Sequence, residues 1–186
     1  MLKEVVNFTD APIDNGKFTE ECRNELEQEG VVTLHNFLKP ETIKELVQEA
    51  KSHSGLAYFT NSTHNVYLTP RNENLSPEHV FNRQLTSSKG CITTDQIPDA
   101  SKLKQLYCSD IFKKFICKVV NETALYEYAD PLSSINVHYA AEGQELNWHF
   151  DNSKFAITLL LQAPKSGGYF EYVSNLRNAE KNEMNF

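Results

Sequence analysis

The chain has 186 residues, of which 40% are hydrophobic and 23% are charged, and its net charge is −7 at neutral pH. This length is typical of one globular domain and is sufficient to bury a hydrophobic core. The excess of acidic residues argues against binding to nucleic acid or to an anionic membrane, because both require basic surfaces. We therefore expect neither of these as a partner.

The start of the chain and its cysteines indicate the compartment. Residues 1–12 lack the basic and apolar regions of a secretory signal, and no apolar run approaches the ~18 residues of a membrane span. The four cysteines, Cys22, Cys91, Cys108 and Cys117, show no CxxC spacing. We therefore expect free thiols in a reducing, cytoplasmic environment.

The first third of the chain predicts two helices and a strand. Residues 19–28 form an acidic helical pattern, with Thr19 suited to cap the helix and Gly30 suited to end it. A β-branched run over residues 30–35 predicts a short strand. Pro40 fits the first turn of a helix that continues over residues 41–53, where apolar residues recur at helical spacing.

The middle of the chain is mixed. Residues 55–70 contain two aromatic, β-prone runs around a polar tip at residues 61–63, which is typical of a hairpin or a pair of loops. Residues 76–78 predict a short helical turn, and residues 86–98 predict a short strand between loops. Residues 99–120 predict two helices that join near Ser109 and Asp110, with apolar faces that belong to the core.

The last part of the chain has sequence patterns that are typical of strands. Four strands are predicted, over residues 134–140, 146–151, 155–162 and 169–173, and turn signals separate them. Helices that come first and strands that cluster afterwards predict an α+β fold.

His149 and Asp151 form the pattern that points to chemistry. In a strand, residues two positions apart share a face and are about 6.6 Å apart along the chain. An imidazole and a carboxylate on one face supply two of the three ligands of the facial triad that binds non-haem Fe(II), and the third must come from elsewhere in the fold. The alternatives are two side chains on a surface strand without a shared role, or a hydrogen-bonded His–Asp couple.

The surrounding residues resemble the Fe(II)/2-oxoglutarate-dependent dioxygenases. The resemblance rests on Tyr139, Gly143, His149 and Asp151, followed by Gly167, Gly168 and Phe170. Within that superfamily the chain is similar to the free-lysine halogenase and hydroxylase group. The segments that carry this similarity are residues 64–70, 88–91 and 130–132.

This resemblance implies a fold of which this chain would contain only a part. It implies one domain over residues 1–186, in which N-terminal helices of residues 1–130 pack on a double-stranded β-helix of the jelly-roll or cupin type. Residues 131–175 correspond to the first half of that β-helix, and residues 176–186 form a polar tail. The family takes its second iron histidine, and the Arg or Lys that binds 2-oxoglutarate, from later strands. The 35 residues after Asp151 contain no histidine. We therefore expect that the C-terminal half of the barrel is missing from this chain, which is a fragment or is completed by another chain.

The resemblance also implies the reaction. Neutral His149 and the carboxylate of Asp151 would bind Fe(II), with 2-oxoglutarate and O2 as co-substrates. The related halogenases have a small residue in place of this carboxylate, which leaves room for chloride. Because Asp151 occupies that position, we expect hydroxylation of a small polar substrate, a free amino acid such as lysine. The rival hypotheses are a binding module without turnover and a hydroxylase of protein side chains.

Six further residues are candidates for binding, and each has a structural alternative. The candidates for 2-oxoglutarate are Tyr139, Asn136 and Thr158, and those for substrate are Asn152, His64 and Asn65. Tyr139 is equally suited to fill the barrel, Asn152 to form a turn, and His64 and Asn65 to form a solvated hairpin tip. A half-closed sheet would expose Ile157, Leu159 and Leu161, so we expect the chain alone to be dimeric or aggregation-prone.

Overall fold

The computed structural model describes residues 2–174, 176–178 and 183–184. The described α-helices are α1 (Gly16–Glu29), α2 (Pro40–His53), α3 (Lys102–Tyr107) and α4 (Asp110–Val119), and the 3-10 turns are η1 (Leu2–Glu4), η2 (Ser54–Leu56) and η3 (Thr94–Gln96). The strands are β1 (Tyr58–His64), β2 (Leu85–Ile92), β3 (Val137–Tyr139), β4 (Arg177–Asn178) and β5 (Glu183–Met184). The predicted α+β class is confirmed. No helix of the described part of the chain is long and apolar enough to cross a membrane.

The ends of the helices are set by capping residues close to them in the sequence. The side chain of Asn15 accepts hydrogen bonds from the backbone N–H groups of Lys17 and Phe18, and Gly30 ends α1 in the left-handed conformation with φ of 75°. Helix α2 begins at Pro40, as predicted. The prediction that Thr19 caps the first helix is wrong, because α1 begins earlier and Thr19 is buried within it.

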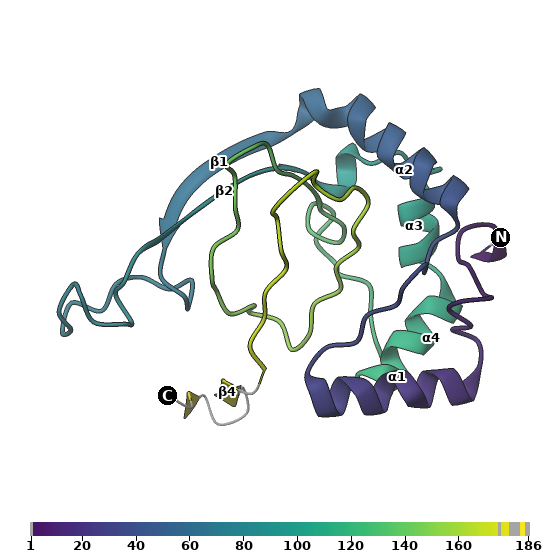
Figure 1. Ribbon diagram of the computed structural model, residues 1–186, viewed down its shortest axis with the longest axis horizontal. Helices are drawn as coiled ribbons and strands as arrows, with labels where there is room; N and C mark the ends of the chain where they lie inside the picture. Colours follow the sequence, from purple (N-terminus) through teal and green to yellow (C-terminus); the bar gives the residue numbers. More distant parts are fainter. Residues whose placement is uncertain (1, 175, 179–182, 185–186) are drawn as a thin grey trace.

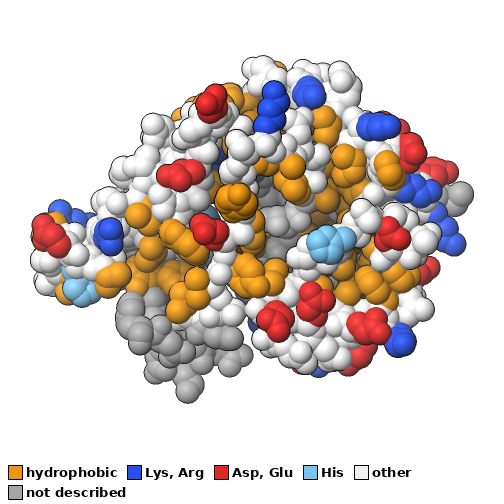
Figure 2. All heavy atoms as spheres, viewed as in Figure 1, with side chains coloured by type: hydrophobic (Ala, Val, Ile, Leu, Met, Phe, Trp, Pro, Cys, Tyr) orange, Lys and Arg blue, Asp and Glu red, His pale blue; other side chains and the backbone are white. Residues whose placement is uncertain are grey.

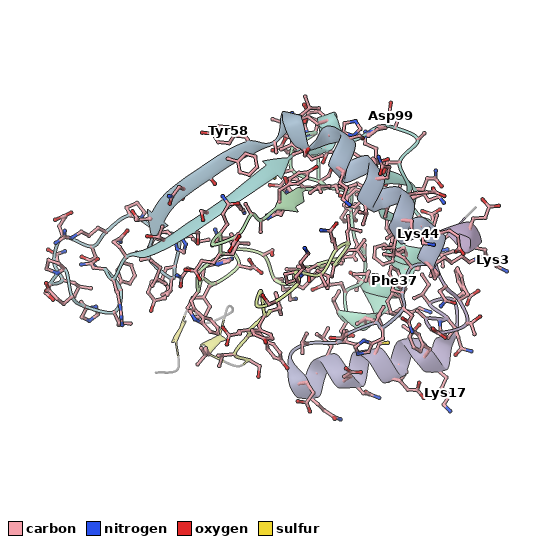
Figure 3. The ribbon with its side chains drawn as sticks, turned by 45° about the horizontal axis from the view of Figure 1, so that its top comes forward. Lys3, Lys17, Phe37, Lys44, Tyr58 and Asp99 are labelled. Carbon is pink, nitrogen blue, oxygen red and sulfur yellow. The ribbon has the colours of Figure 1, made fainter. Side chains whose placement is uncertain are left out.

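The core lies between the helices and the N-terminal segment (Figure 1). Phe18 of α1 stacks on Phe115 of α4 with ring centroids 6.1 Å apart. Phe37, which Figure 3 labels beside the helices, lies 5.8 Å from Phe112. Residues 31–37 contain no strand, so the predicted strand over residues 30–35 is wrong. The backbone bridge in this region joins Val6 to Leu38 instead.

The main sheet is antiparallel, in the order β1-β2-β3. Strand β1 pairs with β2 along its whole length, from Tyr58 opposite Cys91 to His64 opposite Leu85. Residues 61–63 therefore lie inside a continuous strand, and the predicted polar tip at this position is wrong. The two strands form a ribbon that arches away from the helices and ends in the loop of residues 65–84 (Figure 1).

The C-terminal part of the chain is irregular. Strand β3 confirms part of the predicted strand over residues 134–140, but the strands predicted over residues 146–151, 155–162 and 169–173 are wrong. Alternating sequence alone does not make a strand, which also needs a neighbouring backbone that supplies hydrogen bonds. Large hydrophobic side chains of this part are exposed, and hydrophobic side chains gather across the middle of the face in Figure 2.

Candidate functional site

The segment that carries His149 and Asp151 runs back along strand β2. After β3 the chain makes a turn in which the backbone N–H of Gln144 donates to the carbonyl of Ala141 at 3.0 Å. Gly143 has φ of 77° in this turn, a conformation that favours glycine. The chain then returns to β2, where the backbone N–H of Ser88 donates to the carbonyl of Glu145 at 2.9 Å. Residues 145–151, which we call the ligand segment, therefore follow β2 without forming a regular strand.

His149 and Asp151 point toward each other. Nε2 of His149 lies 3.5 Å from Oδ1 of Asp151, and the two side chains are 30% and 56% exposed. Nδ1 of His149 lies 2.7 Å from the carbonyl oxygen of Asn147. Because a carbonyl oxygen only accepts, Nδ1 carries a proton, and in the neutral form of the ring the lone pair of Nε2 then faces the carboxylate.

This arrangement is compatible with a metal ion, and equally with a protonated imidazole that donates to the carboxylate. Two acceptor atoms that face each other repel unless a proton or a cation lies between them. Metal–ligand bonds of about 2.1 Å that meet at a right angle place their two donor atoms about 3 Å apart, close to the separation found here. A histidine that ligates through one nitrogen and donates from the other to a backbone carbonyl is the usual arrangement in metalloproteins.

The pair does not belong to a larger cluster. Among the residues that the structure describes, no group of three or more His, Cys, Asp or Glu side chains is arranged to hold a metal ion. The ring of His64 is near, with its centroid 6.1 Å from that of His149. Both of its nitrogens are engaged, Nδ1 at 3.0 Å from the carbonyl of Asn65 and Nε2 at 2.7 Å from Oγ of Ser87.

A second anchor holds the ligand segment at Phe150, between the two metal-ligand candidates. The backbone N–H of Phe150 donates to the carbonyl of Val66 at 2.8 Å. The ring of Phe150 stacks on Tyr67, 5.7 Å between centroids, and Tyr67 stacks in turn on Phe81 at 4.8 Å. The loop of residues 65–84 and the ligand segment are thus packed together.

This loop lines an open cavity of about 800 Å³. Its lining includes His64, Asn65 and two basic side chains, Arg71 and Arg83. The wall is held by two buried asparagines, because the side chain of Asn65 accepts from the backbone N–H groups of Tyr67 and Thr69, and that of Asn82 donates to three carbonyls of the loop. The predicted residues His64 and Asn65 are therefore brought to one cavity beside His149.

The other candidate residues lie apart from that cavity. The hydroxyl of Tyr139 donates to the carbonyl of Ala50 at 2.7 Å, which ties β3 to the end of α2. Burial, with Cys91 and Glu49 nearby, raises the pKa of this phenol, so it remains a donor. Asn136 lies beside Cys91, with Sγ at 3.6 Å from its side-chain oxygen. Asn152 and Thr158 are exposed.

Two residues of the site were not found from the sequence. Ser87 of β2 and Asn147 of the ligand segment make the hydrogen bonds that connect His64 to His149. A serine in a strand and an asparagine two positions before the histidine carry no distinctive pattern, so no signal in the sequence marked them.

The comparisons with known proteins identify the family. The family model described as Halogenase D matches residues 14–185. The chain therefore belongs to the Halogenase D family, and this membership indicates an enzyme related to the halogenases. No curated protein and no solved structure matches the chain.

Proposed function

We propose that the protein is an Fe(II)- and 2-oxoglutarate-dependent oxygenase that hydroxylates a small polar substrate, a free amino acid such as lysine. The observation that carries this proposal is the pair of facing acceptors, Nε2 of His149 and Oδ1 of Asp151, with the imidazole tautomer fixed by Asn147. Membership of the Halogenase D family supports it. In this proposal residues 131–175 are the first half of a double-stranded β-helix.

His149 and Asp151 would hold the iron. The neutral imidazole would bind through Nε2, while its Nδ1–H donates to the carbonyl of Asn147 and keeps the ring oriented. When bound together with 2-oxoglutarate and O2, the iron would supply the oxidation of a substrate C–H bond to an alcohol. From the resemblance we propose Tyr139, Asn136 and Thr158 for 2-oxoglutarate, and Asn152, His64 and Asn65 for the substrate. Two of them would have to exchange the partners that they have here, the Ala50 carbonyl for Tyr139 and the loop backbone for Asn65.

The carboxylate of Asp151 favours hydroxylation over halogenation. A halide needs a vacant position on the metal, and a carboxylate beside the histidine would occupy that position. Because the family is named for halogenases, halogenation is a candidate reaction beside hydroxylation. In our proposal the side chain of Asp151 decides between the two. We therefore expect an alcohol as the product.

The cavity beside His149 supports an amino acid as the substrate. Arg71 and Arg83 line it, and a guanidinium pairs with a carboxylate through two parallel hydrogen bonds. His64 lies in the wall between this cavity and His149. His149 and Asp151 do not line this cavity themselves, so in this proposal the substrate reaches the metal past His64.

The proposal is tested by titration of the longest available gene product with Fe(II) and 2-oxoglutarate without oxygen. We expect a visible charge-transfer band, and then release of succinate when oxygen and an amino acid are added. Asp151→Ala should abolish both, whereas the control Glu142→Ala, which removes an exposed carboxylate from the nearby turn, should retain both. If no band forms and no amino acid gives succinate, the proposal is wrong.

A second function has one observation in its favour. His149 and Asp151 are the two metal ligands that we propose, and among the described residues no third His, Cys, Asp or Glu side chain is grouped with them. An incomplete set of metal ligands is what we expect of a binding module that keeps part of the family's site but catalyses no reaction. Such a module would bind Co(II) and would release no succinate, whether it is offered amino acids or peptides. Release of succinate with a peptide, but not with a free amino acid, would instead indicate a hydroxylase of protein side chains. If a second copy supplies the third ligand, metal binding should depend on protein concentration.

A further inference from the structure

Ser87 lies where strand β2, the cavity wall and the ligand segment meet. Its side chain is buried, near the start of β2. Its Oγ lies 2.7 Å from Nε2 of His64 and 2.8 Å from the backbone nitrogen of Asn147. One hydroxyl thus contacts both the histidine of the cavity wall and the segment that carries the proposed metal ligands.

The direction of each hydrogen bond follows from its partners. The backbone N–H of Asn147 only donates, so Oγ of Ser87 accepts from it. Nδ1 of neutral His64 donates to the carbonyl of Asn65, which leaves Nε2 as an acceptor for the Ser87 hydroxyl proton. The hydroxyl of Ser87 therefore donates to His64 and accepts from Asn147.

The bond to Asn147 reaches His149 through the backbone. The Ser87 hydroxyl fixes the peptide group before Asn147. The peptide group after it is fixed by the side chain of Asn147, which accepts from the backbone N–H of Trp148 at 2.9 Å. The carbonyl of this second peptide is the one that accepts from Nδ1 of His149. Because each peptide group is planar, holding both of them sets the direction of that carbonyl.

We propose that Ser87 is the positioning residue for His149: through the backbone of Asn147, it holds the imidazole in the orientation and tautomer that leave Nε2 free toward Asp151. This inference rests on the proposed function, since the purpose of a free Nε2 is to bind the metal. Ser87 does not touch the metal or the substrate. The hydroxyl replaces the backbone partner that a regular strand would give Asn147, and the ligand segment has no such partner at this position.

The experiment compares Ser87→Ala with Ser87→Thr, which keeps the hydroxyl. Ser88→Ala is the matched control, because Ser88 contacts the ligand segment through its backbone N–H. The first readout needs no metal. Long-range ¹H–¹⁵N NMR reports the tautomer of the His149 ring, whose signals are identified because they are lost in His149→Gln. The second is quenching by Co(II) of the fluorescence of Trp148, the single tryptophan of the chain.

We expect the Nδ1–H tautomer of His149 in the wild type, in Ser87→Thr and in Ser88→Ala, and a mixture of tautomers in Ser87→Ala. The Co(II) affinity of Ser87→Ala should fall about 10- to 100-fold, the usual effect of removing support from a metal-binding histidine. If Ser87→Ala does not fold, Ser87→Cys carries the same expectation, because a thiol is a weak donor and acceptor.

The outcomes separate this inference from the proposed function. A folded Ser87→Ala variant that keeps the single tautomer and the wild-type Co(II) affinity would overturn the role of Ser87 and leave the metal site standing. A wild type that binds no Co(II), while its tautomer still depends on Ser87, would overturn the proposed function and support the positioning of the ring.

Discussion

Two parts of the molecule are built on different principles. Residues 2–120 hold the described α-helices together with strands β1 and β2, and we call them the helical part; residues 121–174, which hold strand β3, are the irregular part. All the buried side chains of the described residues lie in the helical part, the last of them being Val119. None of residues 121–174 is buried, and the large side chains Tyr126, Leu160 and Tyr169 are each more than two thirds exposed. The proposed metal ligands lie in the irregular part.

The difference shows how much each part depends on its surroundings. A helix satisfies its backbone groups internally, so α1, α2 and α4 need only one apolar face each to pack. Extended segments satisfy theirs only against another backbone. The ligand segment is held instead by single contacts, from Ser87, Ser88 and Val66. A site built in this way depends on a few side-chain bonds, and a core built by helices depends on packing.

The largest expected effect tests this comparison directly. Phe115→Ala should lower the free energy of unfolding by about 3–5 kcal/mol, because Phe115 is buried and stacks on Phe18. Leu160→Ala in the irregular part should change it by less than about 0.5 kcal/mol, because this side chain is 72% exposed. Urea denaturation followed by circular dichroism measures both.

Equal losses for Phe115→Ala and Leu160→Ala would contradict the comparison, because they would mean that residue 160 is buried in solution. A second copy of the chain is one partner that would bury it. In that case the loss for Leu160→Ala should depend on protein concentration, and the loss for Phe115→Ala should not.

The same comparison explains what the sequence predicted. Helical spacing, Pro40, Gly30 and Ser109 marked the ends of helices correctly, because the groups that begin and end a helix lie within a few residues of it. The helix start at Asn15 was missed, because Thr19 is also a residue type that caps helices. The strand predicted over residues 146–151 failed although this segment follows β2, because only isolated hydrogen bonds join the two and no continuous backbone ladder forms. Whether such a ladder forms is not revealed by the sequence of a segment.

For the site, the sequence predicted the residue pair and missed what holds it. A histidine and an aspartate two positions apart lie on one side of any extended chain, so the facing of His149 and Asp151 did not require a strand. The contacts to Ser87 and Val66 join residues far apart in the chain. Such contacts depend on the path of the whole fold, and no local pattern predicts them.

A smaller effect tests the contact between the two parts. Gly30 ends α1 with φ of 75°, and a Cβ added there would lie 2.7 Å from Cβ of Ser174 in the irregular part. Gly30→Ala should therefore cost about 1–2 kcal/mol for the left-handed backbone and more for the clash. Gly16→Ala is the control, because φ of Gly16 is not positive and a Cβ there meets nothing within 4 Å.

A double-mutant cycle isolates the contact from the backbone strain. In a Ser174→Gly background the clash is removed, so Gly30→Ala should cost less there than in the wild type, as measured by urea denaturation. The same cost in both backgrounds would show that residues 30 and 174 are not in contact, which would leave the other contacts between the two parts, such as the hydrogen bond from Tyr139 to the carbonyl of Ala50, to hold them together.

The smallest effect concerns pH and the buried thiol of α1. Burial, followed by the carboxylates of Glu25 and Glu21, raises the pKa of Cys22 from 9.0 to about 11. Between these two values the unfolded chain releases the thiol proton while the folded chain keeps it, so the free energy of unfolding should fall as pH rises from 9 to 11. Cys22→Ala should make this decline shallower in urea titrations at each pH. Cys108→Ala, which removes an exposed thiol, should leave the slope unchanged. If the two variants have equal slopes, Cys22 is open to solvent and the helical part is less tightly packed than its burial indicates.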